Sequence, residues 1–172
     1  MWNLAVQQLL TRFFRLAALL TLSTAAWAAE PVQSAPGVYK LAVQPGISMD
    51  EAAESMRLRA NALNLKLVAE LPLSKQLEAM TGKPQKTIII FQFCDAVVAK
   101  QLIDVNVDFA VFMPCRIALI EETSGKAWLV MMDVDTDAIA REKSLSPELK
   151  KKIEDVRAML INIMKAGASG DL

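Results

Sequence analysis

The sequence predicts an α+β protein, a two-layer sandwich in which helices cover one face of an antiparallel sheet. Several short segments alternate apolar and polar residues, which is typical of strands with one buried face. Two longer segments carry an apolar stripe at helical spacing, and a short glycine-containing turn joins two of the strand segments. The expected order is β-α-β-β-β-β-α, with the helices on one face because their apolar stripes need a sheet beneath them.

The first strand and the first helix follow from local signals. Residues 38–43 alternate in polarity and stop at Pro45, which favours a strand followed by a turn. Ser48 and Glu51 have the spacing of a capping box, in which the hydroxyl accepts from an amide three residues on and the carboxylate accepts from the cap's own amide. We therefore expect a helix over residues 49–63.

The next segments return to strands. Residues 65–73 alternate with a period of two, and the proline at position 72 places their end at an edge or a bend. A short amphipathic helix is predicted over residues 75–80. Residues 87–93 are apolar on both faces and rich in isoleucine and phenylalanine, which predicts a strand in the interior of the sheet.

Two cysteines bracket the middle of the chain. Cys94 ends the apolar strand, and Asp95 is suited to cap a brief helix over residues 96–103. Residues 104–114 are irregular but apolar, and Cys115 opens the next strand. If the two strands are antiparallel neighbours, the cysteines meet at one rim of the sheet. If the strands are parallel, the cysteines lie at opposite ends. We expect the antiparallel arrangement because the connecting helix is short.

The last third of the chain predicts a hairpin and a final helix. Residues 116–122 and 126–132 have strand patterns and flank a turn ending in Gly125. Ser146 is a capping residue followed by a proline at the first helical position. The final helix is expected to end at Gly167.

The N-terminal segment indicates export. Residues 1–15 carry two arginines and no acid, residues 16–22 are an apolar run too short to span a bilayer, and small residues occupy positions 26 and 28. This pattern predicts a signal peptide over residues 1–28 and a periplasmic or secreted protein. The alternative is an uncleaved anchor beginning at Phe13, which would be the protein's sole contact with a membrane.

Removal of 28 residues from 172 leaves 144, the size of one domain. We expect a flexible leader over residues 29–37, a single domain over 38–166 and a disordered tail over 167–172. The removed segment holds two of the 19 basic residues and none of the 19 acidic ones, so the mature charge is 17 minus 19, or −2. This balance argues against a nucleic-acid partner.

The composition excludes several kinds of catalytic site. The chain contains no histidine, so Ser-His-Asp and Cys-His arrangements cannot exist. It has no glycine-rich phosphate loop and no Cys-x-x-Cys motif. Asp133, Asp135 and Asp137 alternate as in a calcium loop, but Ala138 stands where that loop needs glycine. We interpret these aspartates as a solvated turn and do not predict an enzyme.

Three interpretations of the cysteines remain open. An even number of cysteines in an oxidising compartment favours a structural disulfide. A reactive or ligand-holding pair is the second, because a helix N-terminus beside Cys94 and a cation at Arg116 would lower the thiol pKa values. Inert, buried thiols are the third. No cofactor is predicted, although Cys94, Cys115 and Met113 together would suit Cu(I).

Two segments resemble a known bacterial family. Phe93-Cys94-Asp95 leads into a short helix, and Phe112-Met113-Pro114-Cys115-Arg116 opens a strand that is followed by a hairpin with Trp128 in its second arm. This combination resembles domain of unknown function 302 over roughly residues 38–133. The chain departs from the family pattern at Asp95-Ala96, where the family usually has Asn-Pro. The resemblance implies a fold like the TATA-binding-protein sandwich and a homodimer formed through the sheet or its edge. It implies no established activity.

These observations lead to a functional hypothesis. We expect a non-enzymatic binding module that takes a small apolar or sulfur-containing ligand at the cysteine rim, where an arginine is available for an anionic group. The alternatives are thiol exchange or sulfur transfer, with Cys115 attacking and Cys94 resolving, and Cu(I) binding. A third hypothesis makes the protein an assembly partner through its sheet edge or final helix. The predicted ligand-binding residues are Phe93, Phe112, Met113, Arg116 and Trp128.

Overall fold

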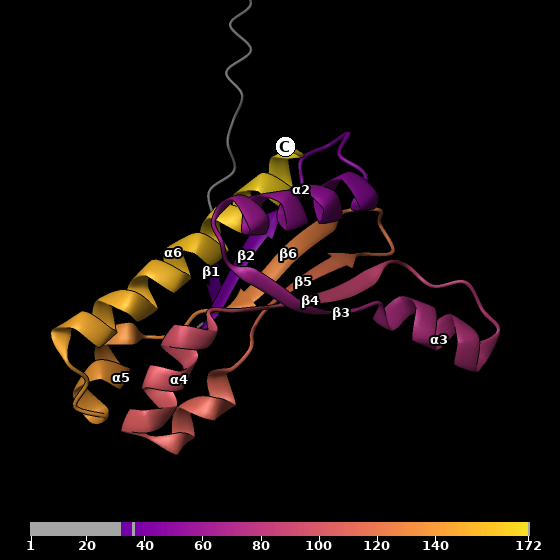
Figure 1. Ribbon diagram of the computed structural model, residues 1–172. Helices are drawn as coiled ribbons and strands as arrows, with labels where there is room; N and C mark the ends of the chain where they lie inside the picture. The colour runs from indigo at the N-terminus through magenta and orange to yellow at the C-terminus, as the bar shows by residue number, and fades with distance from the viewer. Residues whose placement is uncertain (1–31, 36, 172) are drawn as a thin grey trace, which may run out of the picture.

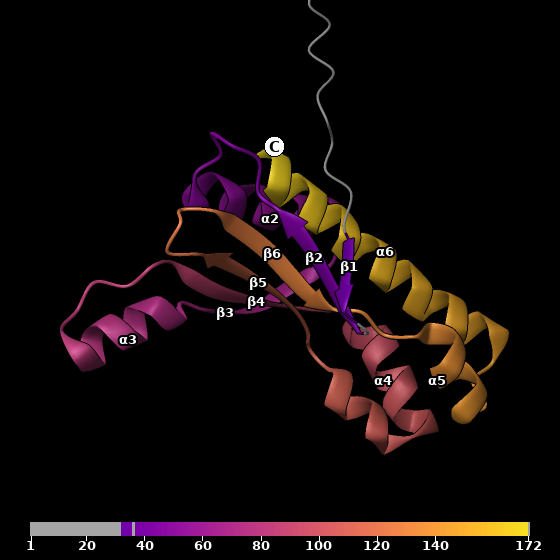
Figure 2. The ribbon, with the colours of Figure 1, turned by 180° about the vertical axis from the view of Figure 1, so that it is seen from behind.

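The computed structural model describes residues 32–35 and 37–171 and confirms the α+β prediction. The strands of this part of the chain form one antiparallel sheet in the order β1-β2-β6-β5-β4-β3. Helices α2 and α6 lie side by side on one face of it (Figure 1). The remaining helices lie beyond the two ends of the strands, α3 at one end and α4 with α5 at the other (Figures 1 and 2).

The strands agree with the predicted segments to within a few residues, apart from one addition. The hairpin of β5 and β6 closes through the predicted turn, and β4 is paired on both sides, as its apolar faces indicated. The strands are β1 (Val32–Ala35), β2 (Val38–Ala42), β3 (Lys66–Leu71), β4 (Ile88–Cys94), β5 (Cys115–Glu121) and β6 (Ala127–Met132).

The predicted helix caps are present. In the capping box the Glu51 amide donates to Ser48 Oγ at 3.1 Å and the Ser48 amide donates to Glu51 Oε2 at 2.8 Å. Asp95 and Ser146 cap α4 and α6 through their side chains. The helices are α2 (Met49–Ala62), α3 (Leu73–Thr81), α4 (Ala96–Val105), the 3₁₀ helix η1 (Val107–Phe112), α5 (Thr136–Glu142) and α6 (Pro147–Ser169).

The core lies between the sheet and the α2–α6 layer. Alternate residues of the strands point toward these helices and are fully buried, as the strand pleat requires. From the helix layer, Met56, Ile163 and Met164 fill the space above them. The fully buried strand residues are Leu41, Phe91, Phe93, Ile117, Leu119 and Leu129.

The opposite side of the sheet has no such cover. No described helix packs across it (Figure 2). Its side chains remain partly exposed. We call this side the open face. It consists of the strand residues that alternate with the buried ones: Val38, Lys40, Ala42, Lys66, Ala69, Leu71, Ile88, Ile90, Gln92, Cys94, Arg116, Ala118, Ile120, Trp128, Val130 and Met132.

The structure differs from the sequence prediction at both ends of the domain. Residues 32–35, expected in a flexible leader, form β1 and pair with β2. Helix α6 passes through Gly167 and ends at Gly170, which adopts a left-handed conformation with φ of 71°. The expected tail therefore begins later than predicted. The predicted signal peptide, residues 1–28, lies outside the described residues.

Two further segments were not predicted as helices. Residues 107–112 form η1, where an irregular stretch was expected. Residues 136–142 form α5, whose first turn is capped by Asp135 through a bond from the Ala138 amide at 2.8 Å. Aspartate is a preferred helix-capping residue, so the alternating aspartates indicated the start of a helix and not only a turn. Within residues 32–35 and 37–171, no helix combines the length and apolar character needed to cross a membrane.

Gly167 is a contact residue and not a helix terminator. A Cβ atom at this position would lie 2.6 Å from Met56 Cγ and 3.1 Å from the Ala52 carbonyl oxygen, both on α2. Met56 is fully buried and has no free space into which to move. The absent side chain thus sets how closely α6 approaches α2.

We predict that Gly167→Ala destabilises the protein. Overpacking of a tight core costs about 1–3 kcal/mol, and the better helix propensity of alanine returns about 1 kcal/mol. Urea unfolding should therefore show a net loss of up to about 2 kcal/mol. The control is Ala158→Gly on the exposed side of α6, which measures propensity alone. A more stable Gly167→Ala protein would contradict the close-contact interpretation.

Candidate functional site

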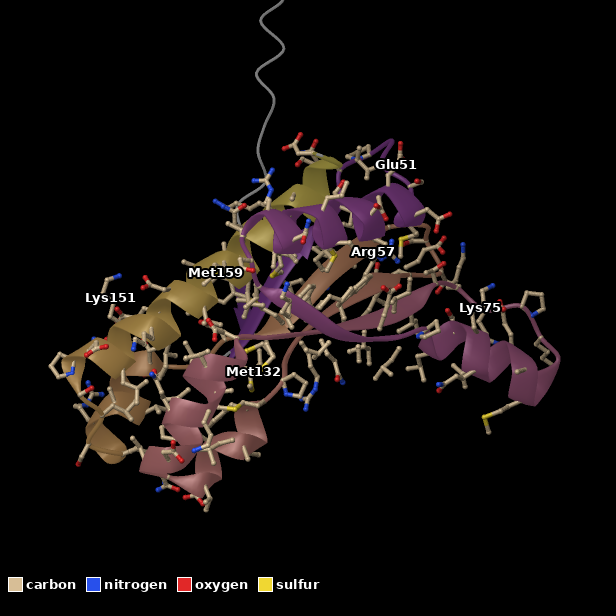
Figure 3. All side chains as sticks on the ribbon, in the orientation of Figure 1. Glu51, Arg57, Lys75, Met132, Lys151 and Met159 are labelled. Atoms are coloured by element: carbon tan, nitrogen blue, oxygen red, sulfur yellow. The ribbon has the colours of Figure 1, made fainter. Side chains whose placement is uncertain are left out.

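An apolar cavity of about 120 Å³ lies at the rim of the sheet where β4 ends and β5 begins. Helix α4 and η1 form one wall, and α5 with the middle of α6 forms another. Figure 3 places Met132, at the end of β6, beside this group of helices. The side chains on which the argument below depends are Cys94, Phe112, Met113, Cys115, Arg116 and Met131.

The cavity exists because α6 is longer than the sheet beneath it. Its 23 residues extend about 34 Å, whereas the seven-residue strand β5 extends about 23 Å. The first turns of α6 therefore overhang the rim, where they contact α4 and α5. A second, smaller core of Leu102, Phe109 and Leu149 supports them, and the Phe109 and Phe112 rings lie 6.4 Å apart. The cavity is the space between the two cores.

Two arginines of different character line the cavity. Arg157 Nε donates to Asp133 Oδ1 at 2.7 Å, and its guanidinium lies 4.9 Å from the centre of the Tyr39 ring. The hydrogen bond to Asp133 raises the pKa of Arg157. Arg116 is exposed and makes no ion pair or side-chain hydrogen bond with any described residue. Arg116 is therefore the cation available to a ligand at this rim.

The cysteines lie at the same rim but on opposite faces of the sheet. The predicted antiparallel pairing of β4 and β5 is confirmed, with Phe93 opposite Cys115. Paired residues share a face, so Cys115 points toward the helices, and Cys94, one residue beyond Phe93, points to the open face. The expectation that the two thiols face each other is therefore wrong. Both cysteines are free, so the structural disulfide, one of the three interpretations left open by the sequence, is not formed.

The environment of each thiol favours its protonated form. Burial raises the pKa of Cys94, and the negative charge of Asp95 raises it further. Burial is also the main cause that raises the pKa of Cys115, with a smaller contribution from Cys94 and an opposing one from Arg116. The prediction that the helix N-terminus and Arg116 lower these pKa values is corrected, because burial outweighs them.

The structure brings together five of the predicted residues and separates two. Phe112, Met113, Arg116 and both cysteines line the cavity. Phe93 lies in the main core, fully buried, with its ring 6.3 Å from that of Phe91. Trp128 is on the open face near the hairpin turn, at the other end of β6 from the cavity.

Sequence reasoning missed the residues that α4, α5 and α6 contribute. Leu102, Ile139, Ile153 and Val156 line the cavity, although the apolar stripe of α6 suggested contact with the sheet alone. The sequence signal that could have revealed them is the length of the apolar stripe of α6. The stripe is longer than a strand of this sheet, so part of it needs other partners.

No metal cluster accompanies the cavity. Among residues 32–35 and 37–171, no group of three or more cysteine, aspartate or glutamate side chains could hold an ion. The three alternating aspartates have other partners: Asp133 binds Arg157, Asp135 caps α5, and Asp137 accepts from Lys150 Nζ at 2.7 Å. Cu(I) binding by two thiolates and Met113 stays a prediction.

Comparisons with known proteins agree with this fold. The model of the family described as domain of unknown function DUF302 matches residues 39–167. An uncharacterized conserved DUF302 protein from Bacillus stearothermophilus, known from a crystal structure, superimposes with a TM-score of 0.61. It is 18% identical, and the similarity covers 77% of this chain and 98% of that one. No curated protein matches the chain. Because the family match extends over well more than half of its residues, the chain belongs to the DUF302 family.

Proposed function

We propose that this DUF302 domain is a non-enzymatic binding module that takes a small, mainly apolar ligand into the rim cavity. The observation that carries the proposal is the cavity itself, which is lined almost throughout by apolar side chains from both cores. Concave apolar sites with a few polar groups are where proteins bind small molecules. Without histidine and with both thiol pKa values raised, the residues here suit binding better than catalysis.

The volume and the lining indicate the class of ligand. A dry protein cavity of roughly 150 Å³ holds benzene or xenon, so a cavity of about 120 Å³ suits a molecule of similar size. The sulfur-containing residues Met113, Met131, Cys94 and Cys115 are among those that line it. Thioether sulfur is polarisable and makes favourable contacts with aromatic rings. Small aromatic or sulfur-containing molecules are therefore the best candidates.

Arg116 adds a preference for a ligand with one anionic end. Arg116 is among the residues that line the cavity, at the border with the open face, and has no acidic partner among the described residues. A carboxylate is a matching acceptor for the planar donor fork of arginine. A ligand with an apolar body inside the cavity and a carboxylate at the rim would contact both the apolar lining and Arg116.

Thiol exchange and Cu(I) binding receive less support than the cavity. Both need the two sulfur atoms to act together, and the strand pleat directs them to opposite faces. Export and a homodimer through the sheet or its edge remain predictions of the sequence.

The cavity proposal predicts that filling the space removes binding. Ala99 lines the cavity from α4, so Ala99→Leu should occupy much of it and weaken binding of benzene and diethyl sulfide by at least about tenfold. Methyl NMR shifts of Ile139, Ile153 and Val156 measure the binding, with Ile163 of the main core as a silent reference.

The matched control makes the same substitution on the exposed side of α4, as Ala96→Leu. It should bind both probes as the parent protein does. Equal binding to all three proteins, or shifts confined to residues away from the rim, would contradict the proposal.

The role of Arg116 predicts discrimination between charged and neutral probes. Arg116→Gln should weaken pentanoate binding by roughly threefold, the scale of an exposed ion pair, and leave diethyl sulfide binding unchanged. Arg141→Gln, an exposed cation on α5 outside the cavity lining, is the control. Parallel loss of both probes in Arg116→Gln would show that the arginine shapes the cavity and does not bind the carboxylate.

The thiol environment predicts slow alkylation. In a Cys115→Ser protein, Cys94 should react with iodoacetamide more slowly at pH 7 than free cysteine, because its raised pKa leaves less thiolate. The rate should rise only as the pH passes the ordinary thiol range. Asp95→Asn keeps a capping side chain but removes the charge, so it should speed the reaction. Alkylation faster than that of free cysteine would revive the thiol-exchange hypothesis.

A further inference from the structure

The open face of the sheet carries positive charge without negative charge. Among its 16 positions, Lys40, Lys66 and Arg116 are basic, Gln92 is neutral and polar, and none is acidic. Lys126 precedes β6 and extends over the same surface, since its ammonium lies 4.0 Å from the centre of the Trp128 ring. The charge is therefore concentrated on a face that is otherwise apolar.

These cations differ from most lysines of the helices. On the helices, exposed lysines such as Lys75, Lys100 and Lys151 each have a carboxylate partner within one turn. In contrast, Lys40, Lys66, Arg116 and Lys126 form no ion pair with any residue of the described chain. Most helix lysines are thus paired with a nearby carboxylate, although Arg59 on α2 bonds only to Asn162, whereas the cations of the open face have no carboxylate partner among the described residues.

Trp128 brings two of the unpaired cations together at the hairpin end of the open face. The Lys40 ammonium lies 3.7 Å from its ring centre, close to the Lys126 contact on the same ring. Its indole Nε1 is buried and has no acceptor among the described residues. A carboxylate placed beside this ring would offset both ammonium groups.

The size of the face fits one segment of a partner. Five strands about 4.8 Å apart and about six residues long give a surface of about 24 by 20 Å, or about 480 Å². A standard protein interface covers about 800 Å² on each partner, which is more than this face offers. A helix of about 15 residues is about 22 Å long and spans it. Two copies placed face to face would also oppose lysine to lysine.

The side chains of the face favour a polypeptide over a membrane. On the central strands, Ile88, Ile90, Ile120 and Val130 are partly buried by their neighbours, whereas Leu71 on the edge strand β3 and Met132 at the end of β6 are 39% and 49% exposed. Insertion into lipid needs protruding apolar groups, whereas partly buried side chains on the central strands suit the interlocking side chains of a packed helix. The protein's own α2 and α6 pack on the other face in this manner.

We propose that the open face binds an acidic amphipathic helix of a partner protein, with the apolar stripe of that helix on Ile90, Ala118 and Val130. Carboxylates along its flanks meet Lys40 and Lys126 on one side and Lys66 on the other. Strands β2 and β3 lie on opposite sides of the central strands, so these lysines are placed to flank such a helix. This inference does not depend on the rim cavity or its ligand.

The test uses the full chain and a defined peptide. The probe is a helical peptide of about 15 residues with leucine and alanine on one face and glutamate on the flanks, labelled for fluorescence anisotropy. It should bind at least about tenfold more tightly than its glutamine twin. Binding should weaken as salt increases, and the indole N–H resonance of Trp128, assigned with Trp128→Phe, should shift.

Two matched triple variants locate the site. Lys40→Gln with Lys66→Gln and Lys126→Gln should weaken binding by about tenfold or more. Lys75→Gln with Lys100→Gln and Lys151→Gln makes the same change in charge on the helices and should bind as the parent does. Figure 3 shows Lys75 on α3 and Lys151 on α6, away from the sheet strands. Circular dichroism checks that both variants are folded.

Several outcomes would overturn the proposal. One is equal affinity for the glutamate and glutamine peptides, and another is an equal effect of the two triple variants. Binding to vesicles of phosphatidylglycerol and phosphatidylcholine that depends on the same three lysines, without peptide binding, would assign the face to a membrane. Sedimentation showing a dimer that Val130→Asp dissociates would assign it to a second copy.

Discussion

The mismatch in length between α6 and the strands is the constraint on which the rest of the structure depends. One half of the helix lies on the sheet, where Gly167 lets it approach α2 closely. The other half extends past the rim and would expose its apolar stripe to water if nothing lay beneath it. Helices α4 and α5 and η1 are present at this rim and build the second core under the overhang. A cavity remains because the side chains of the two separately packed cores do not fill the space between them.

The strand and helix order could be predicted because most elements carry their own local signals. Ser48 with Glu51, Asp95 and Ser146 mark helix starts by side-chain chemistry that needs no tertiary contact. The elements that were missed depend on contacts distant in sequence. Strand β1 exists through its pairing with β2, and α5 is a short helix whose capping residue, Asp135, lies in a row of aspartates that resembled a turn.

The candidate site was predictable in its location but not in its geometry. Cys94, Phe112, Met113, Cys115 and Arg116 share one rim because β4 and β5 are antiparallel, and sequence patterns indicated that pairing. The direction of each side chain depends on register, and a shift of one residue moves a side chain to the other face. Phe93 and Cys115 are directly opposite, so the two thiols are separated by the pleat. Sequence alone did not supply this register, and the predicted thiol pair depended on it.

The same pleat divides the molecule into surfaces with different electrostatic character. On the helix side, charges lie far enough from the core to be paired along the helices, as between Lys151 and Asp155 at 2.8 Å. On the open face the strands themselves carry the charges, and no acidic residue stands beside them. A glutamate at position 92 would fit within that face, because its side chain has nearly the same shape as that of the glutamine present. The glutamine at this position leaves Arg116, its cross-strand neighbour, without a carboxylate. A largely apolar face whose charged residues are all basic is therefore better matched to an acidic helix than to water or to itself.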